Sequence, residues 1–236
     1  MENNRIGVII PSSNTTVEDE FSPALFKTGY SVHYDRIPLV GVTVDELAAM
    51  EKNTEYAAKL LKNAAVGVTA YACTTGSLFK GLGHDIELGN LISSISTSET
   101  VITSGAVVSA LKELGAKNIY VITPYIDDLN KLEKQFLEDN GFNVVRMKGM
   151  KKVENLEIGR ISSDELLRFV GEIDAKDIDA IFLSCTNMPT FSVIEILENK
   201  FKKPVVSSNS ATLWSIAKTA KIKNIGGPGM LFKAVR

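Results

Sequence analysis

Two cysteines, the only ones in the 236-residue sequence, are the residues whose type and setting most clearly suggest chemistry. Cys73 and Cys185 each follow a short apolar run, and hydroxyl-bearing residues come directly after each of them. Two thiols that face each other across a cleft can act on opposite faces of one substrate. Cofactor-free racemisation and isomerisation both need that arrangement, so the sequence predicts a two-thiol site.

The segments upstream of the two cysteines also match each other. Arg5–Pro11 resembles Asn118–Pro124, and the distance from proline to cysteine is 62 positions in the first half and 61 in the second. The chain therefore resembles two copies of one α/β lobe. Each copy would deliver a thiol from the end of an equivalent strand.

Composition excludes several classes of function. The sequence is 44% hydrophobic and 23% charged, with a formal net charge of −2, so it has no nucleic-acid footprint or polybasic membrane patch. No apolar run reaches the roughly 18 residues of a membrane span. The two histidines, His33 and His84, lack partners at metal-ligand spacing, and no phosphate-binding glycine loop is present. We therefore expect no metal and no cofactor. We also expect a cytoplasmic protein, because its N-terminus lacks the plan of a signal peptide.

Strands and helices are expected to alternate, which indicates parallel sheets with right-handed crossovers. The clearest strands are continuous apolar or β-branched runs, at 6–10, 31–37, 66–71, 119–123, 143–147, 180–184 and 204–206. Less regular runs at 86–95 and 225–232 are also read as strands. Helices are expected at 15–26, 43–61, 99–114, 128–140, 162–173, 189–199 and 210–220. Thr15 with Glu18, Thr43 with Glu46 and Ser162 with Glu165 fit capping boxes that open three of these helices.

The loops after the strands hold the candidate binding residues, because the carboxyl ends of parallel strands meet at a cleft. A thiol at the start of a helix is near unpaired N–H groups and the positive end of the helix dipole, which favour thiolate. The same N–H groups, together with nearby hydroxyls and an amide, suit an incoming carboxylate. The side chains concerned are those of Thr74, Thr75, Thr186 and Asn187. A small mono- or dicarboxylate fits this site best.

Structural readings compete with these assignments. A single buried cysteine is more often a small core residue than a nucleophile, but two at equivalent repeat positions favour chemistry. Asn14 has the sequence context of a helix cap as much as of a ligand. Tyr125 could simply pack against its loop. The stretch from Lys131 to Asp139, rich in lysine and glutamate, is read as a solvated helix face.

Four motifs, in this order, resemble the aspartate/glutamate racemase superfamily, most closely its maleate cis-trans isomerase and arylmalonate decarboxylase branch. They are Pro11–Thr16, Tyr71–Cys73, Val121–Tyr125 and Leu183–Cys185. The resemblance implies two pseudo-symmetric α/β lobes with the active site between them. It also implies that the C-terminal segment returns to the first lobe. Lobe one would then comprise 1–97 with 207–236, and lobe two 98–206.

The resemblance further implies roles for individual residues. Cys73 would be the nucleophile and Cys185 its acid and base partner. Asn14 and Tyr125 would bind substrate carboxylate. Four more residues would add polar contacts: Thr74, Thr75, Thr186 and Asn155. The decarboxylases have a glycine at the position of Cys73, so its presence here argues against decarboxylation.

We therefore expect a cofactor-independent isomerase that converts maleate, or a similar small unsaturated dicarboxylate, from cis to trans. An Asp/Glu-type racemase, in which one thiolate removes an α-proton and the opposite thiol returns one, is the main alternative. An arylmalonate-type decarboxylase and a non-enzymatic dicarboxylate-binding protein are less favoured. The expected partner is the small carboxylate substrate, with no nucleic acid and no membrane. We also expect the protein to form a homo-oligomer.

Overall fold

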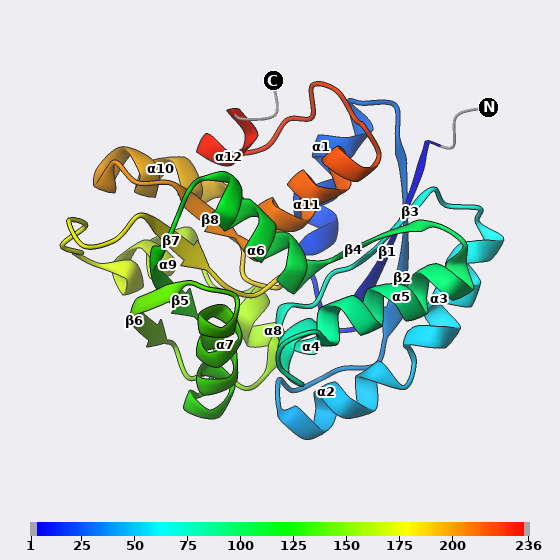
Figure 1. Ribbon diagram of the computed structural model, residues 1–236, viewed down its shortest axis with the longest axis horizontal. Helices are drawn as coiled ribbons and strands as arrows, with labels where there is room; N and C mark the ends of the chain where they lie inside the picture. Colours follow the sequence, from blue (N-terminus) through cyan, green and yellow to red (C-terminus); the bar gives the residue numbers. More distant parts are fainter. Residues whose placement is uncertain (1–3, 234–236) are drawn as a thin grey trace.

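The computed structural model describes residues 4–233 and contains two parallel four-stranded sheets that lie side by side (Figure 1). The strand order is β2-β1-β3-β4 in the first sheet and β6-β5-β7-β8 in the second. The two orders are equivalent, which confirms the predicted pair of α/β units. The strands are β1 (Arg5–Pro11), β2 (Ser31–Ile37), β3 (Val68–Tyr71), β4 (Glu99–Ile102), β5 (Asn118–Thr123), β6 (Asn143–Gly149), β7 (Ala180–Leu183) and β8 (Val205–Ser207).

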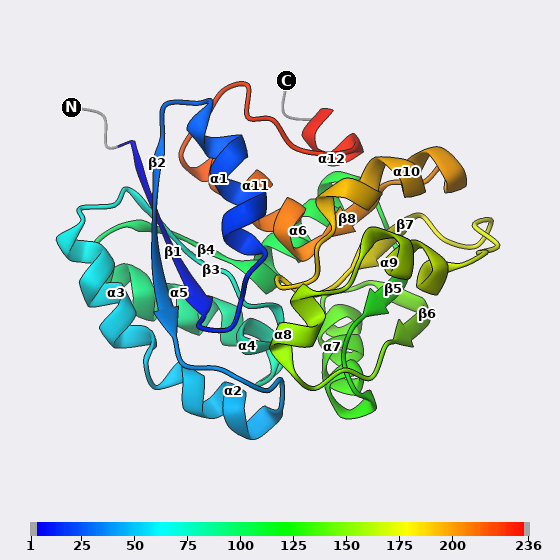
Figure 2. The same ribbon diagram turned by 180° about the vertical axis from the view of Figure 1, so that it is seen from behind.

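Helices cover the sheets and fill the space between them (Figure 2). In the first half they are α1 (Val17–Phe26), α2 (Val44–Glu51), α3 (Thr54–Asn63), α4 (Thr74–Leu78), α5 (His84–Ser96) and α6 (Thr103–Glu113). In the second half they are α7 (Asp127–Asp139), α8 (Asn155–Gly159), α9 (Ser163–Val170), α10 (Phe191–Phe201), α11 (Ser208–Thr219) and α12 (Met230–Lys233).

The central strands are buried on both faces, as expected for parallel sheets flanked by helices. Alternate residues of β7 lie in different hydrophobic clusters: Ala180 and Phe182 in one, Ile181 and Leu183 in the other. Because successive side chains of a strand point to opposite faces, each cluster lies on one face of the sheet. Both clusters include residues from β1 and β5, so the core is continuous across the two lobes.

Two helices join the lobes. Both α6 and α11 contact β4 in the first sheet and β8 in the second, and they pack on each other between the sheets (Figure 1). The inner face of α11 buries Leu213, Trp214 and Ala217 completely or nearly so. Ser207 and Ser210 form a reciprocal capping box that fixes the point where α11 begins. The N-terminus of α11 is thereby held beside the strand ends.

The segment between residues 84 and 102 differs from the sequence prediction. The run at 86–95, predicted as a strand, belongs to helix α5. Its buried positions Leu88 and Ile92 are four residues apart, which is the period of a helix face. The strand comes later, at Glu99–Ile102, where a helix had been expected to begin.

Other boundaries also change. The long helix predicted over 43–61 is divided into α2 and α3, and the expected strand at 225–232 is absent, with α12 forming the end of that segment. The capping box of Thr15 and Glu18 was wrong. Asn14 instead caps α1, because its Oδ1 accepts hydrogen bonds from the N–H groups of Thr16 and Val17.

The predicted lobe boundary, between residues 97 and 98, falls just before β4, which pairs with β3 in the first sheet. The structure therefore keeps residues 99–102 with the first sheet, while α11 contacts strands of both. The outermost residues of the predicted lobe one, 1–3 and 234–236, lie outside the described part of the chain.

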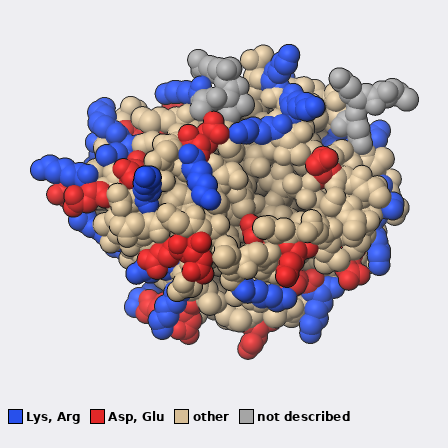
Figure 3. All heavy atoms as spheres, viewed as in Figure 1, with Lys and Arg blue, Asp and Glu red and all other residues tan. Residues whose placement is uncertain are grey.

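Charged side chains of both signs are mixed on the face shown in Figure 3. Within residues 4–233, none of the helices combines the length and the apolar character that crossing a membrane requires.

We predict that the packing of α11 contributes strongly to stability. Leu213→Ala removes a fully buried side chain between the lobes and should lower the free energy of unfolding by about 2–5 kcal/mol, measured by urea denaturation. Leu82→Ala is the matched control, because Leu82 is 63% exposed, and it should change stability by no more than about 0.5 kcal/mol. Equal losses in the two variants would contradict the role assigned to α11.

Candidate active site

Cys73 lies two residues beyond the end of β3, at the N-cap of the short helix α4. The N–H of Ala72 donates to the carbonyl of Ile9 at 2.8 Å, which extends the sheet ladder up to the cysteine. The Sγ atom accepts a hydrogen bond from the N–H of Gly76 at 3.4 Å. The thiol is 5% exposed, so it is almost completely shielded from water.

Cys185 occupies the equivalent place, two residues beyond the end of β7, and is also 5% exposed. Its backbone has φ = +101°, a left-handed region that non-glycine residues rarely adopt. The backbone N–H donates to Ser208 Oγ at 3.0 Å, and Sγ accepts from the N–H of Asn187 at 3.4 Å. Such a conformation persists where the surroundings fix it, and it directs the thiol of Cys185.

Both thiols are free and buried, and the charge of Cys185 affects the ionisation of Cys73. Burial, reinforced by Cys185, raises the pKa of Cys73 to about 12. Burial also raises the pKa of Cys185 to about 11, against the effect of a hydrogen bond from the Tyr125 hydroxyl. Tyr125 is itself 1% exposed, and negative charge on either cysteine raises its pKa further. The thiols and this phenol therefore form one electrostatic unit.

The expectation that the helix dipole favours thiolate at both positions was wrong. The Gly76 N–H does lower the pKa of Cys73, but the loss of hydration outweighs it. Cys185 is not at a helix N-terminus at all, since α10 begins only at Phe191. The N–H groups of Thr190 and Phe191 donate to the carboxylate of Glu20. The raised pKa values of both thiols therefore favour the protonated form at neutral pH.

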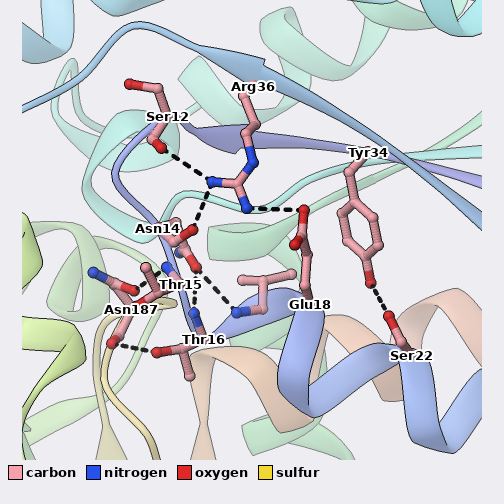
Figure 4. Close-up of polar contacts among 10 residues, drawn as sticks. Ser12, Asn14, Thr15, Thr16, Glu18, Ser22, Tyr34, Arg36 and Asn187 are labelled. Carbon is pink, nitrogen blue, oxygen red and sulfur yellow. Dashed lines mark hydrogen bonds and ion pairs between the residues drawn. The ribbon is translucent and has the colours of Figure 1, made fainter.

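Asn14 lies in the loop after β1, where lobe one meets the segment that follows Cys185 (Figure 4). While its Oδ1 caps α1, its Nδ2 donates to Thr186 Oγ1 at 3.2 Å. Asn187 completes the contact, because its Oδ1 accepts from the N–H of Thr15 at 2.8 Å and its carbonyl accepts from Thr16 Oγ1 at 2.8 Å. The capping and site interpretations of Asn14 are thus combined in one side chain.

The threonines next to the cysteines form hydrogen bonds across the interface between the lobes. Thr74 Oγ1 donates to Ser208 Oγ at 2.8 Å, and Ser208 Oγ is also the acceptor for the Cys185 N–H. Thr186 Oγ1 donates to the carbonyl of Ala72 at 3.0 Å. Each cysteine motif is therefore tied to the other through a hydroxyl group.

Thr75 and Asn155 complete the set of predicted residues. The hydroxyl of Thr75 hydrogen-bonds the sulfur of Cys73 and lowers its pKa. Asn155, the first residue of α8, is buried between the lobes, and its Nδ2 donates to Ser13 Oγ at 2.8 Å. Its carbonyl accepts from Asn187 Nδ2 at 2.6 Å. All eight predicted residues are buried. Hydrogen bonds or electrostatic contacts connect them around the two thiols. The connection of Asn155 is indirect and runs by way of Asn187 and Ser13.

Three neighbours of this site were missed as site residues. Ser208 bridges the two motifs from α11, more than a hundred positions from Cys73 in sequence, and no local pattern shows that contact. Tyr71 and Gly76 shape the space behind Cys73. A Cβ atom on Gly76 would lie 2.9 Å from Cys73 Sγ and 3.0 Å from the Tyr71 hydroxyl. Tyr71 and Gly76 lie two residues before and three residues after Cys73 in the sequence, and this closeness was the signal that could have identified them.

Comparison with known families agrees with this geometry. The family model described as arylmalonate decarboxylase matches residues 6–232. The chain belongs to the arylmalonate decarboxylase family. It is 32% identical to the maleate isomerase of Alcaligenes faecalis over 96% of this chain and 92% of that protein.

Solved structures extend the comparison. The maleate isomerase of Pseudomonas putida S16 with maleate has a TM-score of 0.93, with 27% identity over 98% of this chain and 97% of that one. A cysteine-to-serine variant of Nocardia farcinica maleate cis-trans isomerase, with a covalently bound succinylcysteine intermediate, has a TM-score of 0.91. Its identity is 28%, over 96% of this chain and 97% of that one.

We predict that both thiols of the free protein react slowly with iodoacetamide at neutral pH. Only the thiolate reacts, and with raised pKa values its fraction should grow about tenfold for each pH unit up to at least about pH 9.5. Intact-protein mass spectrometry after timed alkylation measures the rates, with urea-unfolded protein as the control. A plateau in the rate near pH 7 would show that one thiol is already ionised there.

Proposed function

We propose that this protein is a cofactor-independent maleate cis-trans isomerase that uses Cys73 and Cys185. The observation that carries the proposal is the pair of buried, electrostatically coupled thiols, each two residues beyond an equivalent strand. Membership of the family and the likeness to maleate isomerases over nearly the whole chain support the reaction. Maleate, a small cis dicarboxylate, has an electron-poor double bond that sulfur can attack.

In the proposed reaction, the sulfur of Cys73 forms a bond to one carbon of the double bond, and its proton passes to the buried groups around Cys185, which return it on elimination. Cys185 gives its proton to the neighbouring carbon, so the product of this step is a succinyl thioether on Cys73. The former double bond is now single and can rotate. Cys185 then takes the proton back, the carbon–sulfur bond breaks, and fumarate is released. The succinylcysteine in the Nocardia farcinica enzyme is the same kind of adduct, which supports this order of events.

We assign the carboxylate contacts of the substrate to Asn14, Tyr125 and Asn155, with Thr75 beside the attacking sulfur. Amide and hydroxyl donors suit carboxylate oxygens and add no charge of their own. The hydroxyls of Thr74 and Thr186 already donate to Ser208 and Ala72, so their proposed contribution is to hold the two cysteine motifs together. Donors that meet the substrate as charge develops lower the barrier.

The alternatives are less favoured. A racemase would use the same two thiols only to move protons, but the curated relatives that share most of this chain include four maleate isomerases. Decarboxylation would leave Cys73 without a role. We also propose a cytoplasmic location, where thiols stay reduced. Assembly into a homo-oligomer stays a prediction.

We predict that Cys73→Ala abolishes turnover of maleate and that Cys185→Ala lowers kcat by at least about a hundredfold, the usual contribution of a general acid or base. Both variants should stay folded by circular dichroism, because alanine fits the space of a buried thiol. Cys73→Ser should lose more activity than Cys185→Ser, since an alkoxide is far harder to form than a thiolate. Full activity in either alanine variant would rule out the two-thiol mechanism.

We predict that the covalent intermediate accumulates in Cys185→Ser, where the base that triggers elimination is impaired. After incubation with maleate, intact mass should increase by one substrate, and peptide mapping should place the addition on Cys73. The double variant with Cys73→Ala is the control and should show no addition. An adduct on Cys185 in Cys73→Ser would reverse the two assignments.

We predict that Gly76→Ala displaces the sulfur of Cys73. The new Cβ would lie 2.7 Å from Met50 Cε and 2.9 Å from Cys73 Sγ, closer than real Cβ atoms approach, and 3.0 Å from the Tyr71 hydroxyl. Steady-state kinetics should show a loss in kcat of roughly tenfold or more, since small misplacements of reacting groups are costly. Gly226→Ala is the matched control, because no atom lies within 4 Å of the corresponding point. Equal kinetics in the two variants would contradict this role.

A further inference from the structure

Glu133 occupies an unusual position for a carboxyl group. It lies on the inner face of α7 with Leu129, Phe136 and Leu137, and it is completely buried. The sequence had indicated a solvated face for this stretch, and that interpretation was wrong at this position. Burying a carboxyl group is unfavourable unless its partners compensate. A leucine would fill the space without that cost.

The hydrogen bonds of Glu133 do not compensate for its burial. Its Oε1 accepts from Ser184 Oγ at 2.5 Å, and its Oε2 makes no hydrogen bond to any of the residues from 4 to 233. Two other carboxyl groups enclosed between elements have clear structural partners. Glu20 accepts from two backbone N–H groups at the start of α10 and from Asn209, and Glu198 accepts from the N–H groups of Val205 and Met230. Glu133 lacks such a role.

Glu133 is close to the reacting groups. Ser184, its partner, directly precedes Cys185, and both the serine and the glutamate are fully buried. A negative charge on Glu133 raises the pKa of Cys185 and of Tyr125. Burial raises the pKa of Glu133 itself to about 7, although Ser184 lowers it. The carboxyl group can therefore change its charge near neutral pH.

We propose that Glu133 is a positioning residue for the proton of Cys185, and that the two side chains hold one negative charge between them. This inference rests on the proposed function for its meaning in catalysis. In the free enzyme the charge lies on the Glu133 carboxylate and Cys185 is a thiol, ready to act as an acid. In the covalent intermediate the pair again holds one proton and one negative charge, because the proton that Cys73 releases replaces the one that Cys185 gave to carbon.

The protons balance over this cycle. On addition, the S–H bond of Cys73 breaks, its sulfur bonds to carbon, and its proton goes to the pair formed by Cys185 and Glu133. The S–H proton of Cys185 goes to the neighbouring carbon. Elimination reverses both transfers and leaves the pair with the same single negative charge. Since the net charge of the site is the same before and after addition, no unpaired second charge is created among these buried side chains.

The remaining groups around Glu133 do not compete for this role. The titratable side chains coupled to it are Cys185 and Tyr125. Helix α4, which packs on α7, has no charged residue. The charged residues of β6, Arg146 and Lys148, are exposed. The other acidic and basic residues of α7, from Asp127 to Asp139, are not buried.

The first test is the pH dependence of kcat/KM for maleate in Glu133→Gln, which keeps the shape of the side chain and removes its charge. In the wild type, activity should rise as the pH increases through about 7, because the reaction starts from the Glu133 carboxylate. This rise should be absent in Glu133→Gln, with kcat about tenfold lower or more and KM little changed. Glu138→Gln, on the same helix with a side chain that is 39% exposed, is the matched control and should keep the wild-type profile.

A second variant keeps the test decisive if Glu133→Gln folds poorly. Ser184→Ala removes the hydrogen bond that lowers the pKa of Glu133, so the rise in activity should move to higher pH. A purely structural hydrogen bond would change stability or kcat without moving this ionisation. An unshifted rise in Ser184→Ala, or a wild-type profile in Glu133→Gln, would overturn the inference.

A measurement that needs no turnover separates this inference from the proposed function. In the Cys73→Ala background, Cys185 is the only thiol, and its alkylation rate reports its ionisation. Glu133→Gln removes a nearby negative charge and should speed alkylation by about threefold to tenfold at about pH 8.5, with Glu138→Gln unchanged. An unchanged rate would refute the coupling. A faster rate in a protein that fails to isomerise maleate would refute only the proposed function.

Discussion

The exclusion of water from the two thiols is the constraint on which the rest of this structure depends. A thiol that loses hydration holds its proton more tightly, and here burial outweighs the N–H groups that favour thiolate. Each neighbour of the sulfurs therefore has consequences for chemistry, because a buried charge can be compensated only by the protein or the substrate. The coupled thiols, the phenol of Tyr125 and the carboxyl group of Glu133 are parts of one electrostatic system.

The two lobes place the two cysteines in the same way. Equivalent strands β3 and β7 each end two residues before a cysteine. Beyond each strand end, one more backbone hydrogen bond continues the pairing with the neighbouring strand, from the N–H of Ala72 to the carbonyl of Ile9 and from the N–H of Ser184 to the carbonyl of Ile122. Hydroxyls and amides then tie the two motifs together across the lobes. Ser208 contacts both motifs, so the start of α11 helps to fix their separation. A site of this kind needs the interface between the lobes to be as well packed as a core.

The sequence was sufficient for the repeat, the two-sheet fold and the cysteine pair, because continuous apolar runs and strand-end residues are local signals. Features set by tertiary contacts could not be predicted in this way. The positive φ of Cys185 depends on its bond to Ser208, and the protonated state of Cys73 depends on burial by distant segments. The position of Glu133 was partly predictable. The spacing from Leu129 to Leu137 places it on the inner face of the helix, but the many lysines and glutamates of this stretch indicated a solvated face instead.

The most direct test of the central claim is proton NMR of the wild-type enzyme in D2O with maleate and, separately, with aspartate and glutamate. Addition and elimination through Cys73 predict that the maleate signal disappears as the fumarate signal grows. They also predict that the α-protons of both amino acids remain. Deuterium at an amino-acid α-carbon, with maleate unchanged, would contradict the isomerase and indicate that the two thiols only move protons.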